Sequence, residues 1–163
     1  MRQIDNTGGL DLRAKLLAMS PTDLKLKPTQ HLPRVWAALL DWGLRGASAT
    51  IAVVADGTVS MYTSAGGGMI GAGQHQQIHM PAARFLKTVE AIVDSLPPAT
   101  EAPLPREGEA AIVALTYDGM RRGLVELKLL SPKDPFARAW VAGQDLITAL
   151  RELQDTLEKD QKK

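Results

Sequence analysis

Residues 49–63, which read ATIAVVADGTVSMYT, contain the clearest structural signal in the sequence. The first half of this stretch is rich in β-branched residues and the second half alternates apolar with polar residues, and both patterns are typical of strands. Asp56-Gly57 stands between the halves, and these two residue types tolerate the positive φ angles that a tight turn requires. The stretch therefore predicts a β-hairpin.

A second hairpin is predicted further along the chain. Residues 109–117 resemble a strand, Asp118-Gly119 can form the turn, and residues 123–130 resemble the returning strand. The proline-rich segment 97–108 precedes this hairpin, and we expect it to be a loop.

Four helices are predicted around the two hairpins. A short amphipathic pattern over residues 10–19 predicts the first helix. Pro33 suits the first turn of a helix, and residues 33–44 are apolar nearly all round, which predicts a second helix buried on several sides. A third helix is expected to begin at Pro81, and the last is expected over residues 134–153.

The predicted fold class is α+β, with an antiparallel sheet built from two β-hairpins and flanked by helices in the order α-α-β-β-α-β-β-α. Two hairpins exclude a doubly wound parallel sheet, because that fold needs strands and helices that alternate. The length of 163 residues suits one domain, which we expect over residues 10–153. Residues 1–9 are expected to be a flexible N-terminus, and the charged tail 154–163 is expected to fray.

From residue 33 to residue 153 this order of elements resembles the roadblock-like (profilin-like) group of small α/β modules. The segment that carries the resemblance is GLRGASATIAVVADGTVSMYTSAGG, residues 43–67. The resemblance implies a dimer that acts as a scaffold or a platform for partners such as small GTPases and motors. The glycine segment 66–75 also looks like part of uncharacterised bacterial proteins, and that resemblance implies no function.

Residues 64–79, SAGGGMIGAGQHQQIH, combine a cluster of glycines with two histidines four positions apart. The glycines fit G-x-G-x-x-G, but a dinucleotide site needs a parallel strand before this pattern and a helix that begins within it. Here a hairpin precedes the pattern, the next helix is expected only at Pro81, and no lysine is present for a Walker-type loop. Two interpretations stay open: backbone N–H groups that bind an anion, or glycines that permit a bulge or a close backbone crossing.

The ligand-binding interpretation names specific residues. The candidates are Gly66, Gly67, Gly68, Gly71, Gly73, His75 and Arg122. His75 and His79 could share one side of a helix, but a zinc protease needs glutamate where this sequence has Gln76, and His31 is the only other histidine. We therefore predict no metal site, no cofactor and no catalytic residue.

Composition excludes several classes of protein. The absence of cysteine excludes disulfides and thiolate chemistry. A formal net charge of +1 and an aromatic content of 4% argue against a nucleic-acid partner, which needs a basic surface or a stacking platform. There is no apolar run of about 18 residues and no apolar region typical of a secretory signal, so we expect no membrane partner and a cytoplasmic protein.

The predicted apolar helix of residues 33–44 carries more hydrophobic surface than one small sheet covers, which favours a homodimer or another protein partner. The candidate interface residues are Trp36, Leu39, Leu40, Trp42, Met69 and Ile70. A helix buried inside the monomer is the alternative interpretation. The sequence thus favours a non-enzymatic, homodimeric interaction or scaffold module. The alternative is a small-ligand or anion-binding protein, with an enzyme among the options, that uses the loop at residues 66–73.

Overall fold

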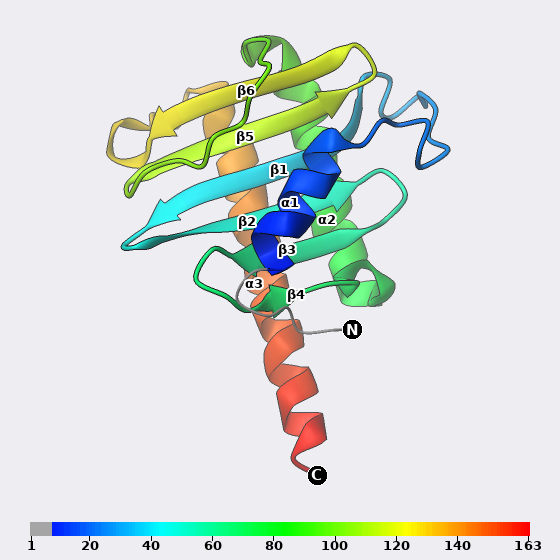
Figure 1. Ribbon diagram of the computed structural model, residues 1–163, viewed down its shortest axis with the longest axis vertical. Coiled ribbons are helices and arrows are strands. Elements are labelled where there is room, and N and C mark those ends of the chain that lie inside the picture. Colours follow the sequence, from blue (N-terminus) through cyan, green and yellow to red (C-terminus); the bar gives the residue numbers. More distant parts are fainter. Residues whose placement is uncertain (1–7) are drawn as a thin grey trace.

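The computed structural model describes residues 8–163, in which a six-stranded antiparallel sheet has the strand order β4-β3-β2-β1-β5-β6 (Figure 1). The strands are β1 Val35–Leu44, β2 Ala47–Val54, β3 Val59–Thr63, β4 Gly68–Met69, β5 Glu109–Thr116 and β6 Gly119–Glu126. The α-helices are α1 Gly8–Ala18, α2 Gln76–Ile92 and α3 Pro135–Gln161, and three short 3-10 helices are Ala72–Gln74, Val93–Ser95 and Leu127–Leu129. None of the helices in residues 8–163 is both long enough and apolar enough to cross a membrane.

The α+β class and both predicted hairpins are confirmed, whereas the predicted order of elements is wrong. The chain follows the order α-β-β-β-β-α-β-β-α. β2 and β3 are joined across Asp56-Gly57, where Gly57 has a φ of 94°, and β5 and β6 are joined across the turn at Asp118. The first hairpin uses the predicted turn residues. The second turns one residue earlier than predicted, at Tyr117-Asp118, because Gly119 already pairs with Thr116, and its returning strand is Gly119–Glu126 rather than residues 123–130.

The helix predicted over residues 33–44 is instead the strand β1, which lies inside the sheet and pairs with β2 on one side and β5 on the other. A strand covered on both faces is apolar at nearly every position, so it does not show the usual alternation of strands. Its alanine, leucine and tryptophan side chains also suit a helix, and pairing with two neighbouring strands overrides that preference. Gly46, with a φ of 74°, lies in the turn between β1 and β2.

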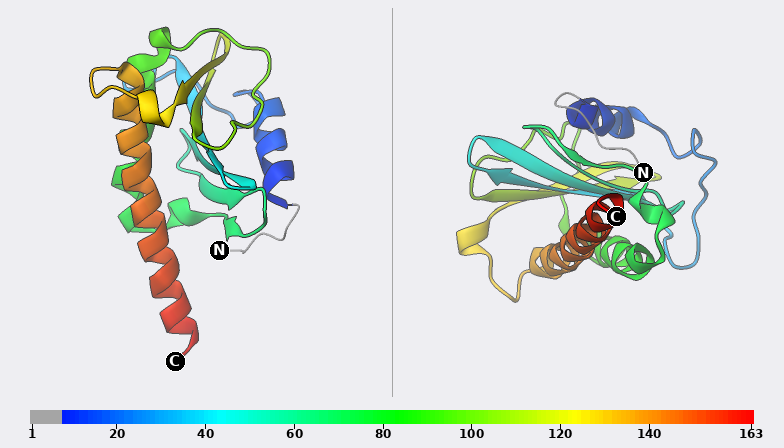
Figure 2. Two further views of the ribbon diagram at one scale, coloured as in Figure 1. Left: turned by 90° about the vertical axis from the view of Figure 1, so that its left-hand side faces the viewer. Right: turned by 90° about the horizontal axis from the view of Figure 1, so that it is seen from below.

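Helices cover both faces of the sheet (Figure 2): α2 and α3 lie on one face and α1 lies on the other. Successive β1 side chains point to opposite faces, so Leu40 belongs to the larger core beneath α2 and α3, whereas Leu39 belongs to the smaller core on the α1 face. Phe85 from α2 and Leu146 from α3 are fully buried in the larger core. The two layers explain why β1 must be apolar on both sides.

The α1 face carries a buried ion pair that joins three distant segments. Arg13 from α1 donates to Asp41 from β1 through Nε at 3.1 Å and through Nη2 at 2.6 Å, and the same Nη2 donates to the carbonyl oxygen of Ala102 at 2.7 Å. Thr50 on β2 donates its hydroxyl to Asp41. Burial, with a further contribution from the charge of Asp41, raises the pKa of Tyr62 and keeps its phenol neutral. This network anchors α1 to the sheet.

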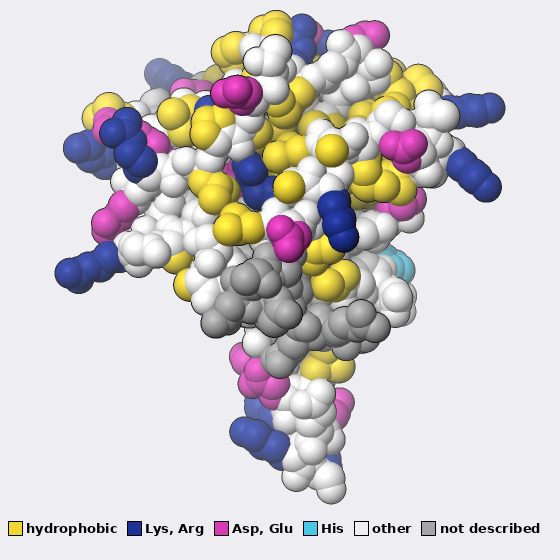
Figure 3. Space-filling view, in the orientation of Figure 1, with side chains coloured by type: hydrophobic (Ala, Val, Ile, Leu, Met, Phe, Trp, Pro, Cys, Tyr) yellow, Lys and Arg dark blue, Asp and Glu magenta, His cyan; other side chains and the backbone are white. Residues whose placement is uncertain are grey.

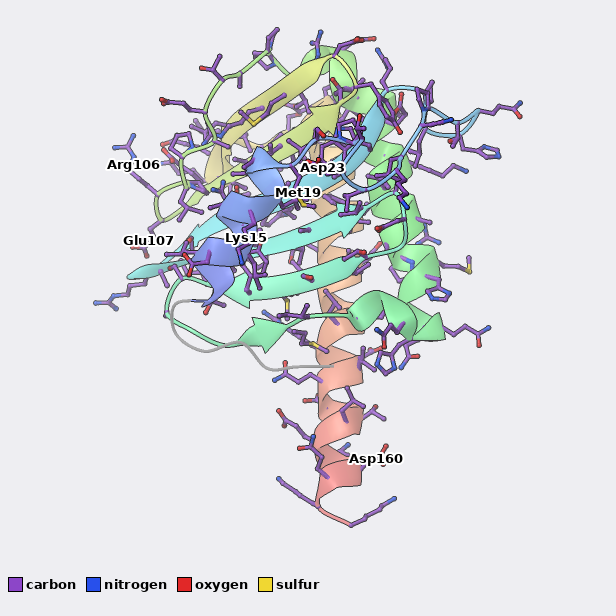
Figure 4. The ribbon with its side chains drawn as sticks, turned by 45° about the vertical axis from the view of Figure 1, so that its right-hand side comes forward. Lys15, Met19, Asp23, Arg106, Glu107 and Asp160 are labelled. Carbon is purple, nitrogen blue, oxygen red and sulfur yellow. The ribbon has the colours of Figure 1, made fainter. Side chains whose placement is uncertain are left out.

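Hydrophobic side chains gather around α1 on the same face (Figure 3), where a single helix and extended loops cover the sheet. Lys15 and Met19 mark the C-terminal half of α1 and the residue just beyond it, and Asp23 marks the loop that follows (Figure 4). Leu16, Leu17 and Met19 are only partly buried against the smaller core. This covering is therefore thinner than the two-helix layer opposite.

Helices α2 and α3 are longer than the sequence predicted. α2 begins at Gln76, so Pro81 lies inside the helix, because the extended backbone of His75 ends the preceding turn before the proline is reached. The tail predicted to fray from residue 154 continues α3 as far as Gln161, and Asp160 lies on the part that projects beyond the sheet (Figure 4). Leu153 and Leu157 extend the buried stripe of α3, which favours helix there. The N-terminus predicted to be flexible lies outside the described residues up to residue 7, and the next two residues begin α1.

Glu90 on α2 attaches this helix to the start of β1. Its Oε2 accepts from the backbone N–H of Val35 at 2.7 Å and of Arg34 at 3.2 Å, and its Oε1 accepts from Arg34 Nε at 3.2 Å. Glu90 lies in the last turn of α2, which ends at Ile92. Its role is to satisfy the backbone of an entering strand.

We expect Glu90→Gln to lower the free energy of unfolding by about 1–2 kcal/mol, because an amide keeps one acceptor for Val35 but loses the charge that faces the Arg34 guanidinium. Urea denaturation followed by circular dichroism measures the loss. Asp94→Asn is the matched control, since exposed Asp94 touches the same guanidinium and should cost less than about 0.5 kcal/mol. Equal losses in the two variants would show that Glu90 has no special structural role.

Candidate functional site

The first glycines of the segment form the turn between β3 and β4. Gly66, Gly67 and Gly68 have φ angles of 106°, 84° and 149°, a region that other residues rarely enter. A side chain on Gly68 would also collide with β3, since its Cβ would lie 2.3 Å from the carbonyl oxygen of Met61. These glycines have a structural explanation that requires no ligand.

The last glycine of the segment lies at a second close crossing. A Cβ on Gly73 would lie 1.9 Å from the carbonyl oxygen of Gly57, so the 3-10 turn before α2 packs directly on the turn between β2 and β3. Gly71, just before this turn, has a φ of 77°. This geometry agrees with the interpretation that the glycines permit a close approach of backbones.

The predicted ligand residues do not come together at one site. Arg122 lies on β6, and the glycine turn lies beside β4, which is at the opposite edge of the sheet. Arg122 instead donates through Nη2 to the carbonyl oxygen of Pro103 at 2.7 Å. His75 precedes α2 and does not line either cavity next to the glycines. Only Gly71 and Gly73 of the predicted set border a cavity near the segment.

Two adjoining cavities lie where the β2–β3 turn meets α2, and His79 borders both. One has a volume of about 490 Å³ and is lined by Asp56, Gly57, Thr58, Gly71, Gly73, Gln74 and His79. The other has a volume of about 310 Å³ and is lined by His31, Leu32, Val53, Val54, Ala55, Gly57, Val59, His79, Ala82, Ala83, Leu86 and Lys87. His79 Nε2 donates to the carbonyl oxygen of Gly73 at 2.8 Å, which holds the ring at the junction.

The sequence indicated one of the residues at these cavities. It singled out the pair His75 and His79, but it could not show which of the two faces a cavity, because the helix was expected to begin after both. His31 lies in an irregular segment far from His79 along the chain, and only the tertiary fold brings both histidines to the same cavity. No local pattern could have identified that pair.

A larger groove lies on the outer surface between α2 and α3. It has a volume of about 870 Å³ and is lined by Met80, Ala83, Arg84, Lys87, Thr88, Ala91, Pro132, Ala137, Arg138, Val141, Ala142 and Asp145. Met80 is 72% exposed and Val141 is 57% exposed, although both are large apolar residues. Arg84, Lys87 and Arg138 make the groove basic, with Asp145 as its one acidic side chain. The sequence analysis did not identify this surface.

The reason for predicting an interface at the candidate interface residues does not hold in the structure. Trp36, Leu39, Leu40 and Met69 are at most 2% exposed, because the sheet and the helices of the same chain cover them, and Trp42 and Ile70 are half-buried. Trp36, Leu39, Leu40 and Trp42 were predicted as parts of an apolar helix that lacked cover, and the structure has a strand there. Met69 and Ile70 come from the glycine segment and lie in or beside β4. A homodimer through these residues has no support from the fold.

The buried acids have structural partners. Asp41 is paired with Arg13, and Glu90 is paired with Arg34. Across residues 8–163, no three histidine, aspartate or glutamate side chains lie together in a way that could hold a metal ion. The cavities of the described residues include the two adjoining cavities, the groove between the helices, and a further cavity of about 400 Å³ that Arg122 lines at the other edge of the sheet.

Comparisons of this chain with models of protein families, with curated proteins and with solved structures find no significant match. The structure defines an α+β protein with a six-stranded antiparallel sheet and helices on both faces. Its order of elements differs from the order on which the roadblock-like resemblance was based. Since many folds host unrelated functions, the function must be argued from the surfaces described above.

Proposed function

We propose that this protein is a non-enzymatic interaction module whose α2–α3 groove binds an amphipathic helix of a partner protein. The single observation that carries the proposal is the exposure of Met80 and Val141 beside one continuous groove. Exposed large apolar side chains that gather around a depression are typical of interaction surfaces, whereas scattered ones are not informative.

The shape of the groove favours a helical partner. Two helices packed side by side leave a furrow that accepts the side-chain ridge of a third helix. Ala83, Ala91, Ala137 and Ala142 line this furrow with small side chains, which allow a partner to approach closely. An amphipathic helix would place its apolar stripe there and keep its polar face in water.

The charges of the groove favour a partner with acidic residues beside its apolar stripe. Arg84, Lys87 and Arg138 outnumber the one acid, Asp145. A second copy that docked groove to groove about a twofold axis would bring these basic residues together, which costs free energy. The groove therefore supports a different protein as the partner, and the homodimer and the roadblock-like scaffold role expected from the sequence remain predictions.

A photo-crosslinking amino acid placed at Val141 tests the proposal in cells of the source organism. We expect one protein to be crosslinked through an acidic amphipathic segment, and a synthetic peptide of that segment to bind the purified chain. Arg84→Glu combined with Arg138→Glu should weaken the peptide roughly a hundredfold, because two opposite-charge contacts become repulsive. A crosslinker at Leu129, an apolar residue that is 71% exposed and lies outside the groove, is the matched control.

Three results would overturn the proposal. Equal crosslinking from position 129 would show that the surface is unselective. Crosslinking of Val141 only to a second copy of the chain, with a dimer mass by light scattering, would replace the partner with a homodimer. Peptide binding that survives the charge reversal would show that the groove does not recognise acidic residues.

A further inference from the structure

We propose that the 310 Å³ cavity between the β2–β3 turn and α2 is a binding site for a small carboxylic acid with a compact apolar body. The site adjoins the α2–α3 groove and shares Ala83 and Lys87 with it, but its two histidines and its apolar floor lie outside the groove, so this inference goes beyond the interaction function. It rests on a cavity that is apolar in its floor and carries only basic or neutral polar groups at its rim.

The floor of the cavity is suited to an apolar body. Val53, Val59, Ala82 and Leu86 are buried residues of β2, β3 and α2, and all of them line it. A volume of 310 Å³ lies at the lower end of the size typical of small-molecule sites, which is about 300–1,000 Å³. A ligand the size of a bicyclic aromatic acid or a medium-length fatty acid would fill it.

The rim of the cavity is suited to one negative charge. His31, His79 and Lys87 line it, and neither aspartate nor glutamate does. Within the described part of the chain no carboxylate lies within ion-pair distance of Lys87. Asp56 lines the adjoining cavity and would repel an anion from that side. The carboxylate should therefore lie towards Lys87 and His31.

The orientation of the His79 ring at this rim is fixed by one hydrogen bond from Nε2. A carbonyl oxygen can only accept a hydrogen bond, so the contact with Gly73 requires the proton to be on Nε2. Nδ1 is then the ring nitrogen available to a ligand, as an acceptor when the ring is neutral and as a donor to a carboxylate when it is protonated. The glycine segment thus contributes by orienting a side chain, through the Gly73 carbonyl group.

The donor set favours a carboxylate over a phosphate. Phosphate dianions in proteins are usually held by arginine forks or by several backbone N–H groups. No arginine lines this cavity, and its rim offers one ammonium and two imidazoles. One singly charged head group with an apolar body matches that set.

Isothermal titration calorimetry of the full chain with 1-naphthoate and octanoate tests the site. We expect saturable binding with a dissociation constant below about 1 mM for at least one acid, and binding at least tenfold weaker for 1-naphthamide, which lacks the charge. Inorganic phosphate alone should not bind. Ring signals of His31 and His79 in NMR spectra should shift on titration, whereas those of His75 should not.

Three variants assign the binding to this cavity. His31→Ala and His79→Ala should each weaken naphthoate roughly tenfold, because each removes a contact to the charged head. His75→Ala is the matched control and should leave the dissociation constant unchanged. His31 makes no side-chain hydrogen bond within the described residues, so His31→Ala should preserve stability. His31→Ala therefore still tests the site if His79→Ala, which removes the contact with Gly73, unfolds the turn.

Four results would overturn the inference: no saturable binding of either acid at about ten millimolar, equal affinity for the neutral amide, equal affinity in His31→Ala and the unaltered chain, or an equal loss in His75→Ala. Arg84→Glu with Arg138→Glu separates the two proposals. It should weaken peptide binding in the groove by the same factor of about a hundred and leave naphthoate binding intact, since neither arginine lines this cavity.

Discussion

Asp41→Asn is expected to lower the free energy of unfolding by about 3–5 kcal/mol, because it leaves the Arg13 guanidinium buried without its counter-charge. Asp41 is 0% exposed, so water cannot replace the lost carboxylate. The hydroxyl group of Thr50 also loses its charged acceptor. Urea denaturation measures the loss, and Asp41→Asn should also weaken the attachment of α1, seen as faster amide hydrogen exchange in that helix.

Replacing both members of the pair should be far less harmful than replacing one. A buried ion pair is held against a large desolvation cost, so apolar residues of similar size often serve as well. We expect Arg13→Met with Asp41→Leu to lie within about 1 kcal/mol of the unaltered protein. Arg106→Met is the surface control and should cost less than about 0.5 kcal/mol, since the Arg106 side chain is 90% exposed and lies 3.6 Å from Glu109. If the double variant were as unstable as Asp41→Asn, the charge itself would be required.

Gly68→Ala and Gly73→Ala are expected to destabilise the protein by about 3 kcal/mol or more each, because a new Cβ would overlap a backbone carbonyl oxygen. Gly68 would add strain from its φ of 149°. Backbone cannot move aside as a flexible side chain can, so the β3–β4 turn or the β2–β3 turn would have to shift. Thermal unfolding by calorimetry measures both losses.

Gly67→Ala separates the two reasons for glycine in this segment. Gly67 has a φ of 84° but open space around it, so only the backbone conformation is strained and the expected cost is about 1–2 kcal/mol. Gly67→Val and Gly71→Val should likewise reduce stability, as the structural interpretation of the segment requires. A variant at position 68 or 73 with an unchanged melting temperature would show that the close crossings are wrong.

The hairpins were predictable because their information is local. Asp56-Gly57 specifies the first turn by its own conformational preferences, Asp118 lies in the second turn with Gly119 directly after it, and the flanking residues suit strands. β1 was not predictable in the same way. An apolar run of this kind is typical both of a helix buried on all sides and of a strand covered on both faces. Only the pairing with β5, about 70 residues later in the chain, decides between the two structures.

The candidate sites could be predicted from the sequence even less than β1 could. The sequence drew attention to the glycine segment and to His79, and Gly73 does hold that histidine in place. It could not bring His31 to the same cavity or separate Arg122 from the segment, because both depend on the order of strands in the sheet. The α2–α3 groove depends on which helix faces remain uncovered, and no residue pattern marked Met80 or Val141 in advance.

The place of β1 in the sheet has a consequence for synthesis of the chain. β1 to β4 are consecutive, so they can pair as soon as they leave the ribosome, but β5 follows only after α2 and the proline-rich loop. Until then, the most apolar strand of the protein presents an unpaired edge of backbone N–H and carbonyl groups. A nascent chain that stalls before residue 109 would therefore keep this edge unpaired, and unpaired strand edges promote aggregation.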